Sequence, residues 1–360
     1  MSKSLCALVM AGGTGGHVFP ALAVAKSLSA QSVDIHWLGT KRGIESKLVP
    51  AANIPLHCIQ VEGVRGKRKL SLLLAPFKLI KALWQAGKVL RQLKPHVVVG
   101  FGGFASGPGG FMARVMGIPL LIHEQNAIAG TTNKLLRPLA SKVMQAFAGA
   151  LPKAETVGNP VRAEILALAE PAERIDDANP AVNLLVIGGS LGAKAINELL
   201  PQALALMPEV SRPNVWHQTG AAHADVTAQI YQDLHLHNAQ IDAFVDDMAA
   251  AYQWADVVVC RAGALTVSEL AAAGLASVLI PYPWAIDDHQ AKNAEVLVDA
   301  GAAFMCRQET MTAASLDNIL AGLINDKAQL LRMAESARQL AQPDAAHEVA
   351  NACLELMNNA

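Results

Sequence analysis

The chain has 360 residues, and its 29 Lys and Arg against 30 Asp and Glu give a formal net charge of −1. This balance excludes a uniformly basic nucleic-acid-binding protein, and a hydrophobic content of 52% excludes a disordered chain. The charge is unevenly distributed, because residues 1–160 carry 19 basic and 5 acidic side chains and residues 161–360 carry 10 and 25. Such an asymmetry is typical of proteins that contact an anionic surface or polymer.

The sequence contains no segment typical of a membrane-spanning helix. The charge-free stretch 95–113 is interrupted by glycines and two prolines. The apolar residues near the start of the sequence are interrupted by the glycines of 12–16, which favours a strand and a loop over a signal peptide. The five cysteines lie far apart without a C-x-x-C pair, a pattern typical of a reducing compartment and not of a zinc site.

Short apolar runs that alternate with Ala- and Leu-rich stretches predict strands and helices in both halves of the sequence. In the first half, strands are expected at 5–10, 35–38, 97–99, 120–122 and 143–144. After a polar stretch at 170–180, strands are expected at 184–187, 215–216, 241–245, 257–260 and 278–280, and helices follow from about residue 312. Continuous apolar strands alternating with helices predict parallel sheets covered on both faces. We therefore expect an α/β protein with two doubly wound domains, residues 1–162 and 163–360, whose last helix packs back on the first domain.

Each predicted domain opens with a glycine-rich turn between its first strand and first helix, at 12–17 and at 188–193. Backbone N–H groups at such a helix start bind phosphate without specific side chains, although tight-turn packing alone also explains a single loop. The first loop lacks the third glycine of a dinucleotide fingerprint, and no acidic residue follows the second strand. A G-K-S/T phosphate-binding motif is absent as well.

Polar residues follow several predicted strands, where α/β folds bind ligands. His17 lies where the first loop becomes a helix, and it is a candidate general base, phosphate contact or simple helix-start hydrogen-bonder. The glycines of 100–108 and the polar residues 123–126 also follow strands and are candidates for the same site, or for a surface turn and a helix cap. Thr266 and Glu269 have the spacing of a capping box, while Glu269 also lies where ribose hydroxyls are often held.

No metal site is predicted. The adjacent pairs Asp246-Asp247 and Asp287-Asp288 precede predicted helices, where acidic residues act as caps. The histidines between 217 and 237 lack the spacing of metal ligands on a helix.

The segment 63–94 holds much of the basic excess of the first half. Its basic residues are Arg65, Lys67, Arg68, Lys69, Lys78, Lys81, Lys88, Arg91 and Lys94. Apolar residues lie between them, among them Phe77, Ile80 and Trp84. A basic amphipathic helix with aromatic residues is typical of a segment that lies in a membrane interface, and we favour an anionic membrane over nucleic acid as its partner. A helix packed on its own sheet with a solvated basic face is the alternative.

Six motifs are spread along essentially the whole chain. They are residues 12–21 (GGTGGHVFPA), 102–108 (GGFASGP), 123–126 (HEQN), 157–162 (VGNPVR), 188–193 (GGSLGA) and 264–269 (ALTVSE). Together and in this order they resemble the MurG family of bacterial N-acetylglucosaminyltransferases. The resemblance implies a GT-B architecture of two Rossmann-like domains facing across a cleft, without a cofactor or metal. It implies inverting transfer of GlcNAc from UDP-GlcNAc to the 4-hydroxyl of MurNAc in undecaprenyl-diphosphate-MurNAc-pentapeptide.

The resemblance also implies a location at the cytoplasmic face of the bacterial inner membrane, as a peripheral protein of peptidoglycan synthesis. Contacts with other cell-wall synthesis or division proteins are further partners that it suggests. In this picture the first domain binds the acceptor and the membrane, and the second binds the donor.

The residues of the family's donor site correspond to these positions: Thr14, Gly15, Gly16, Asn126, Arg162, Ser190, Val245, Ala264, Leu265, Thr266, Val267, Ser268, Glu269 and Gln290. By this resemblance, Arg162 and Ser190 meet the UDP diphosphate. The backbone of Val245 meets uracil, Glu269 binds the ribose and Gln290 binds the GlcNAc hydroxyls. His289 stands where many relatives have glutamine.

The acceptor's diphosphate and sugar are expected at the first glycine loop and at Gly102 and Gly103. His17 is the first candidate for the base that activates the acceptor hydroxyl, and Glu124 is the second. Two other interpretations of the sequence stay open. One is a UDP-GlcNAc 2-epimerase with the same GT-B architecture, and the other is an NAD(P)-dependent oxidoreductase, for which the dinucleotide fingerprint is missing.

Overall fold

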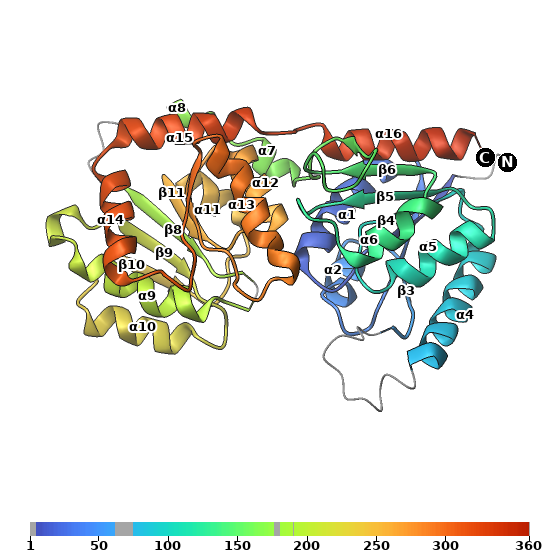
Figure 1. Ribbon diagram of the computed structural model, residues 1–360, viewed down its shortest axis with the longest axis horizontal. Coiled ribbons are helices and arrows are strands. Elements are labelled where there is room, and N and C mark those ends of the chain that lie inside the picture. Colours follow the sequence, from blue (N-terminus) through green and yellow to red (C-terminus); the bar gives the residue numbers. More distant parts are fainter. Residues whose placement is uncertain (1–4, 62–74, 176–180, 190, 360) are drawn as a thin grey trace. The chain divides into compact units, whose positions relative to one another are not determined.

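The computed structural model describes residues 5–61, 75–175, 181–189 and 191–359 (Figure 1). The chain divides into two compact units. Unit 1 comprises residues 1–162 together with 342–360, and unit 2 comprises 163–341. Residues 342–360 therefore belong to unit 1, whereas a division of the sequence at residue 162 alone assigns them to the second domain.

Unit 1 is built on a sheet of seven strands in the order β3-β2-β1-β4-β5-β6-β7, in which every pair is parallel. The strands are β1 (Cys6–Met10), β2 (Asp34–Gly39), β3 (Leu56–Cys58), β4 (Val97–Gly100), β5 (Leu120–Glu124), β6 (Lys142–Gln145) and β7 (Glu155–Thr156). The helices are α1 (Gly15–Ala30), α2 (Glu45–Ala51), α4 (Ala75–Leu93), α5 (Ser106–Val115), α6 (Thr131–Leu136), the 3₁₀ helix Arg137–Leu139 and α16 (Ala345–Asn358).

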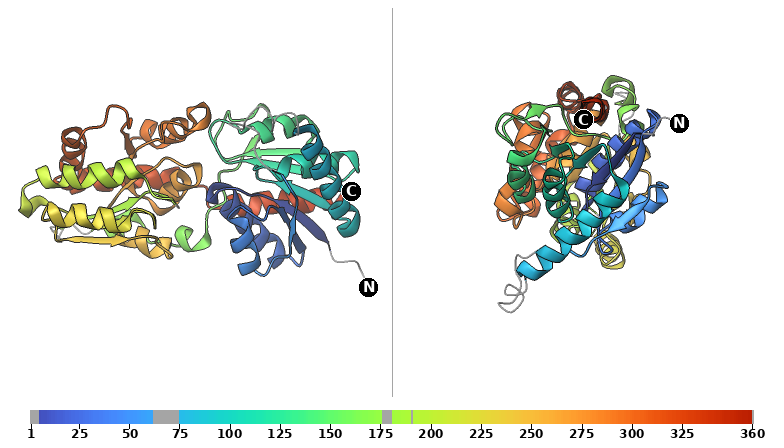
Figure 2. Two further views of the ribbon diagram at one scale, coloured as in Figure 1. Left: turned by 90° about the horizontal axis from the view of Figure 1, so that it is seen from below. Right: turned by 90° about the vertical axis from the view of Figure 1, so that its right-hand side faces the viewer.

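Helices cover both faces of this sheet (Figure 2). Alternate strand residues point to opposite sides, so both faces carry apolar side chains that pack against helices. On one face, Val9 and Trp37 pack with residues of α1 and with Val349 and Cys353 of α16. On the other face, Leu8 and Leu38 belong to a second core with residues of α4, α5 and α6. The strand order changes direction between β1 and β4, whose carboxyl ends lie side by side, and doubly wound folds bind ligands at such a point.

Unit 2 repeats this plan with six parallel strands in the order β10-β9-β8-β11-β12-β13. The strands are β8 (Asn183–Ile187), β9 (Asn214–Gln218), β10 (Ala239–Asp242), β11 (Val257–Cys260), β12 (Ala276–Leu279) and β13 (Ala303–Met305). The α-helices are α7 (Ala163–Leu166), α8 (Pro171–Arg174), α9 (Lys194–Leu206), α10 (Ala224–Asp233), α11 (Met248–Trp254), α12 (Ala264–Ala273), α13 (His289–Asp299), α14 (Ala313–Ile324) and α15 (Lys327–Gln339). The 3₁₀ helices are Glu209–Ser211 and Ile286–Asp288.

The predicted α/β class with doubly wound parallel sheets is confirmed, and most predicted strands lie within observed ones. The strand predicted at 241–245 is wrong at its end, because β10 is Ala239–Asp242 and Val245 is buried in the loop that follows. Strands β3, β7 and β13 were not predicted. They have only two or three residues, and β7 is exposed, so no continuous apolar run marks them.

The helix α4 lies at the outside of unit 1 and has two different halves (Figure 1). Its second half packs on the sheet through Ala86 and Leu90. Its first turns, Pro76 to Lys81, are exposed. Among the described residues, no helix combines the length and hydropathy that crossing a bilayer requires.

Candidate active site

The first glycine loop of unit 1 is held in place by a buried carboxylate that sequence reasoning missed. Glu45, fully buried at the start of α2, accepts hydrogen bonds from the N–H of Gly13 at 3.0 Å and from the Thr40 hydroxyl at 2.7 Å. A side chain at Gly12 would collide with the same carboxylate, since a Cβ there would lie 2.6 Å from Oε1. Gly12 therefore makes room for Glu45, and α1 begins immediately after this loop, with Thr14 as its N-cap residue.

The second glycine loop packs directly against the first. Gly103 has φ of +82°, and a Cβ there would lie 2.5 Å from the carbonyl oxygen of Gly12. Gly102 has φ of +92°, and a Cβ there would lie 3.2 Å from Cε1 of His17. Only glycine fits both conditions, so the two loops and the His17 ring form one surface at the carboxyl ends of β1 and β4. The predicted residues Gly15, Gly16, His17, Gly102 and Gly103 are thus brought together.

His17 is joined to β5 by a chain of hydrogen bonds. Its Nδ1 lies 2.8 Å from Oε1 of Gln125, whose Nε2 lies 3.1 Å from Nδ1 of His123. His123 in turn places its Nε2 2.9 Å from the carbonyl oxygen of Gly158. Gln125 and His123 are buried, while His17 is partly exposed. Burial lowers the pKa of His123 to about 4, so this ring is neutral at neutral pH.

Glu124, the second candidate base, is occupied by the loop that follows β5. Its carboxylate accepts hydrogen bonds from the N–H groups of Asn126 and Gly130, both at 3.0 Å. The side-chain amides of Asn126 and Asn133 donate two more, at 3.1 and 2.9 Å. With four donors and 1% exposure, this carboxylate organises the loop and positions Asn126.

The glycine loop of unit 2 shows the same close packing of backbone. Gly192 has φ of +78°, and a Cβ there would collide with the carbonyl oxygen of Thr219. Ser190, which the family resemblance places at the diphosphate, lies outside the described residues.

The helix α12 follows the next strand of unit 2, β11, and begins at Ala264 with Gly263 as its N-cap residue. No side chain caps it, so the predicted capping box of Thr266 and Glu269 is wrong. The helix starts two residues before Thr266, which leaves Glu269 in its second turn, where it cannot reach the N-cap. Glu269 is 4% exposed, and the hydroxyl of Tyr252 donates to its Oε2 at 3.1 Å. Of the predicted residues 264–268, the first turn presents the N–H groups of Ala264, Leu265 and Thr266. The N–H of Val267 instead donates to the carbonyl oxygen of Gly263, and the Ser268 hydroxyl donates to that of Ala264.

The remaining predicted donor residues occupy separate elements of their units. In unit 2, Gln290 in the first turn of α13 accepts a hydrogen bond from the N–H of Tyr282 at 2.9 Å. Val245 lies in the loop after β10. In unit 1, the guanidinium of Arg162 stacks over the ring of Phe19 in α1, 5.1 Å from its centroid. Arg162 thereby lies beside the helix that carries His17.

Acidic pairs before helices have mixed roles. Asp247 caps α11 as predicted, accepting from the N–H of Ala250 at 2.9 Å. The prediction for Asp288 is wrong, because this residue has φ of +52° and its carboxylate pairs with Arg307 at 2.7 Å, without capping α13.

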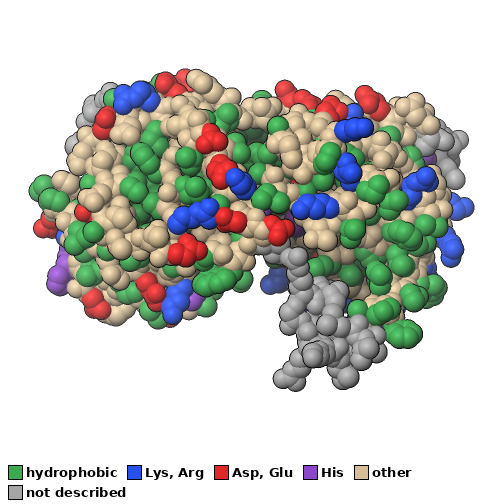
Figure 3. All heavy atoms as spheres, in the orientation of Figure 1, with side chains coloured by type: hydrophobic (Ala, Val, Ile, Leu, Met, Phe, Trp, Pro, Cys, Tyr) green, Lys and Arg blue, Asp and Glu red, His purple; other side chains and the backbone are tan. Residues whose placement is uncertain are grey.

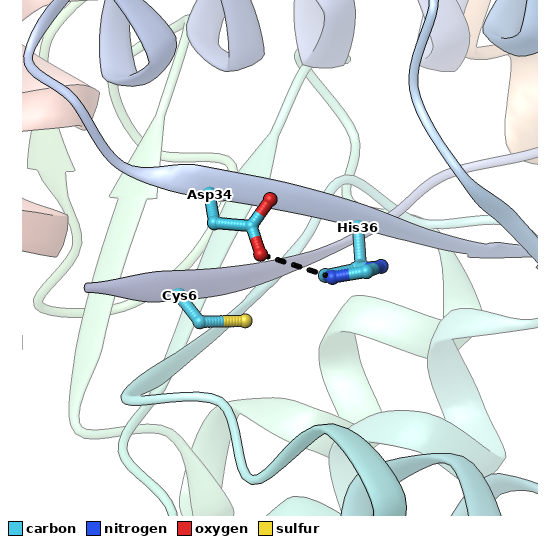
Figure 4. A group of neighbouring side chains, drawn as sticks. All are labelled: Cys6, Asp34 and His36. Carbon is cyan, nitrogen blue, oxygen red and sulfur yellow. Dashed lines mark hydrogen bonds and ion pairs between the residues drawn. The ribbon is translucent and has the colours of Figure 1, made fainter. Parts of the chain in front are cut away.

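One group of metal-binding side chains gathers among the described residues, away from these loops (Figure 4). Cys6, Asp34 and His36 lie near the amino ends of β1 and β2, with ligand atoms within 4.8 Å of one another. His36 Nε2 lies 3.3 Å from Asp34, and its Nδ1 lies 3.1 Å from Nε2 of His57. Both ring nitrogens of His36 thus have hydrogen-bond partners.

The exposed half of α4 presents the apolar residues predicted for membrane contact. Phe77, Ile80 and Trp84 are exposed by 71, 62 and 63%, and Lys78 and Lys81 lie among them. Phe111 and Val115 of the neighbouring α5 are 45 and 62% exposed, and Figure 3 shows hydrophobic side chains gathered over this part of unit 1. We call Phe77, Ile80, Trp84, Phe111 and Val115 the apolar patch.

Comparison with known proteins bears on both units. Residues 7–145 match the model of the glycosyltransferase family 28 N-terminal domain, and residues 183–349 match that of the C-terminal domain. The chain belongs to glycosyltransferase family 28 and, within it, to the MurG family. It is therefore an enzyme of the glycosyltransferase class with GT-B architecture.

Curated relatives support this membership over nearly their full length. A Cellvibrio japonicus protein is 56% identical over 360 residues, covering 98% of this chain and 99% of its own. A Pseudomonas fluorescens protein is 56% identical, covering 97% and 98%. Both are named UDP-N-acetylglucosamine–N-acetylmuramyl-(pentapeptide) pyrophosphoryl-undecaprenol N-acetylglucosamine transferase.

Solved structures agree. MurG of Acinetobacter baumannii is 44% identical, with a TM-score of 0.86 over 98% of this chain and 99% of that one. A UDP-N-acetylglucosamine 2-epimerase also shares the fold, with a TM-score of 0.67 over 99% of this chain and 98% of that one. At 10% identity, that likeness concerns the fold alone.

Proposed function

We propose that the chain transfers GlcNAc from UDP-GlcNAc to the 4-hydroxyl of MurNAc in undecaprenyl-diphosphate-MurNAc-pentapeptide, with inversion at the anomeric carbon. The observation that carries the proposal is His17, a partly exposed imidazole set between two glycine loops at the carboxyl edge of the unit 1 sheet. Relatives whose names state this reaction are more than half identical to the chain.

In this mechanism His17 is the general base. Its Nε2 accepts the proton as the O–H bond of the acceptor hydroxyl breaks, and the oxygen forms a bond to the anomeric carbon of GlcNAc. The bond from that carbon to the diphosphate breaks, and its electron pair leaves with UDP. The charge balances, because the imidazolium carries the proton that the hydroxyl lost. Glu124 is the weaker candidate, since four donors already surround its carboxylate.

The donor is proposed to bind mainly in unit 2. The first turn of α12 offers backbone N–H groups at the positive end of a helix, which suits the diphosphate that leaves with UDP. Glu269, buried one turn further on, is proposed to accept hydrogen bonds from the ribose hydroxyls, with Val245 at uracil and Gln290 at the sugar. Arg162 supplies positive charge, and the resemblance suggests that this stabilisation needs no metal or cofactor.

The acceptor lipid is proposed to bind in unit 1, with its diphosphate and sugar at Gly102, Gly103 and the first glycine loop. The apolar patch, beside Lys78 and Lys81, is proposed to rest on the anionic cytoplasmic face of the inner membrane. Each buried large apolar side chain would contribute roughly 1.5–3 kcal/mol to that contact.

One assay tests the reaction. The protein is mixed with radiolabelled UDP-GlcNAc and a lipid-linked MurNAc acceptor, and the products are separated. Glycosylated lipid with a β-1,4 linkage supports the proposal. UDP with free ManNAc would instead identify an epimerase, and the absence of both products would contradict glycosyl transfer.

A further inference from the structure

The hydrogen-bond chain behind His17 has a single consistent set of donors and acceptors. The carbonyl of Gly158 only accepts, so the neutral ring of His123 must carry its proton on Nε2. Nδ1 of His123 is then an acceptor, and the Gln125 amide donates to it at 3.1 Å. The same Nε2 of Gln125 donates to the carbonyl of His123 at 2.9 Å.

These two contacts fix which way the Gln125 amide points. If the amide were turned over, its oxygen would face two acceptors, the Nδ1 and the carbonyl oxygen of His123. The side chain is 1% exposed, so water cannot compensate for such a mismatch. Oε1 of Gln125 is therefore held toward His17, 2.8 Å from its Nδ1.

This oxygen determines the tautomer of His17. Because an amide oxygen only accepts, Nδ1 of His17 carries the proton, and in the neutral ring Nε2 therefore holds the lone pair. We propose that Gln125 is a positioning residue that holds the Nδ1–H tautomer of His17, leaving Nε2 as the atom that takes the proton of the acceptor hydroxyl. The inference rests on the proposed function and deepens it by assigning the base's orientation to a second residue.

With a neutral amide, this arrangement provides the orientation of the ring that a buried carboxylate provides in catalytic triads, without its negative charge. A carboxylate accepts in any orientation, whereas an amide needs a partner that fixes its oxygen, and His123 with Gly158 supplies that partner. His123 thus acts on His17 only through Gln125.

The tautomer itself is measured without any variant. In protein labelled with ¹⁵N-histidine, NMR correlations between the ring nitrogens and the carbon-bound ring protons report which nitrogen of neutral His17 carries the proton, and His17→Gln assigns the signal. The expected result is Nδ1–H. Nε2–H in the wild-type protein would overturn the inference, whatever the activity.

Gln125→Met removes the hydrogen bonds and keeps the volume of the side chain. We expect His17 to lose its uniform Nδ1–H state and kcat to fall about tenfold, the size of one neutral hydrogen bond, at an unchanged KM for UDP-GlcNAc. Gln145→Met is the matched control, because Gln145 of β6 is 3% exposed and bonds the N–H of Leu151 and the hydroxyl of Thr156. It should lower stability to a similar degree without changing the tautomer or kcat.

A double-mutant cycle separates positioning from a general effect. In the His17→Ala background, Gln125→Met should cause no further loss of kcat. A full tenfold loss in that background, or an unchanged kcat in the wild-type background, would overturn the role of Gln125. If the wild-type chain forms no glycosylated lipid, the proposed function fails, while the NMR result still decides the tautomer.

Discussion

The two units have the same order of their first six strands, and each contains a chain of hydrogen bonds between buried polar side chains. The two hydrogen-bond chains differ in whether their last residue reaches the surface. In unit 1 the chain runs from Gly158 through His123 and Gln125 to the partly exposed His17. In unit 2, His217 of β9 lies 3.1 Å from Oδ1 of Asn197 and 3.0 Å from the hydroxyl of Tyr231.

The difference lies in where each chain stops. Tyr231 and His217 are both buried, so the hydrogen-bond chain of unit 2 has no contact with solvent and stabilises the core. The unit 1 chain opens onto the glycine loops and orients a ring that can take up a proton. The same fold thus uses one kind of network for packing and another for chemistry, and the exposure of the last member distinguishes them.

The largest expected effect comes from removing the open end of the unit 1 chain. His17→Ala should lower kcat by about 10²–10⁴, the usual contribution of a general base, because no other described acceptor replaces Nε2. UDP binding, measured by calorimetry, should stay unchanged, since the donor is assigned to unit 2. Intact turnover with weaker acceptor binding would make His17 a phosphate contact instead.

The next effect concerns the surface of unit 1. Phe77→Ala combined with Trp84→Ala should weaken binding to anionic vesicles by about 10²-fold or more, because two large apolar side chains no longer enter the interface. Co-sedimentation with vesicles measures this. The matched control is Trp284→Ala, since Trp284 of unit 2 is 72% exposed. Equal binding by the double variant and the wild type would contradict the proposed contact of the apolar patch with the membrane.

A smaller effect is expected at the donor residues of unit 2. Glu269→Gln should weaken UDP affinity by roughly tenfold to a hundredfold, the value of a hydrogen bond to a charged group. Tyr252→Phe removes only the donor to Oε2 and should cost far less. Calorimetry with UDP measures both, and a Glu269→Gln variant that binds as tightly as the wild type would exclude the ribose role.

The last prediction concerns the pH dependence of the free energy of unfolding, to which His217 in the buried hydrogen-bond chain of unit 2 contributes. Burial lowers the pKa of His217 to about 3 from an ordinary value of 6.5. Between these values the unfolded chain binds a proton that the folded unit does not, so stability falls as the pH drops below 6.5, by about 1.4 kcal/mol per pH unit. His217→Gln should reduce the slope by this amount and leave the contribution of His123, measured by urea unfolding at pH 5 and 7. Equal slopes in both proteins would contradict it.

Local patterns predicted what depends on neighbours in the sequence. The buried strands β4 and β11 are continuous valine-rich runs, and the glycine content of the two loops is sufficient to predict them. The strand expected at 241–245 was partly wrong because the apolar Val245 is buried by a loop, and burial alone does not specify a strand.

Long-range partners explain what sequence reasoning missed. Glu45 meets Gly13 across 32 residues of sequence, and Gln125 meets His17 across 108. Nothing near Glu45 marks it as buried, since glutamate is usually exposed. The polar stretch 123–126 indicated a site, but not which of its side chains reaches His17. A glycine at position 12 is compatible with the close approach of another group to the backbone, but it does not identify that group as Glu45.

The return of α16 to unit 1 sets an order of events during synthesis. Val349, Ala350, Cys353 and Met357 complete the core that covers β1 and β2 on the α1 face. About 180 residues of unit 2 are made between Arg162 and Gln342. At about 5–20 residues per second, a ribosome needs roughly 10–40 s for them. For that interval the α1 face of the nascent unit lacks its final cover, so the part of the protein that begins first is finished last.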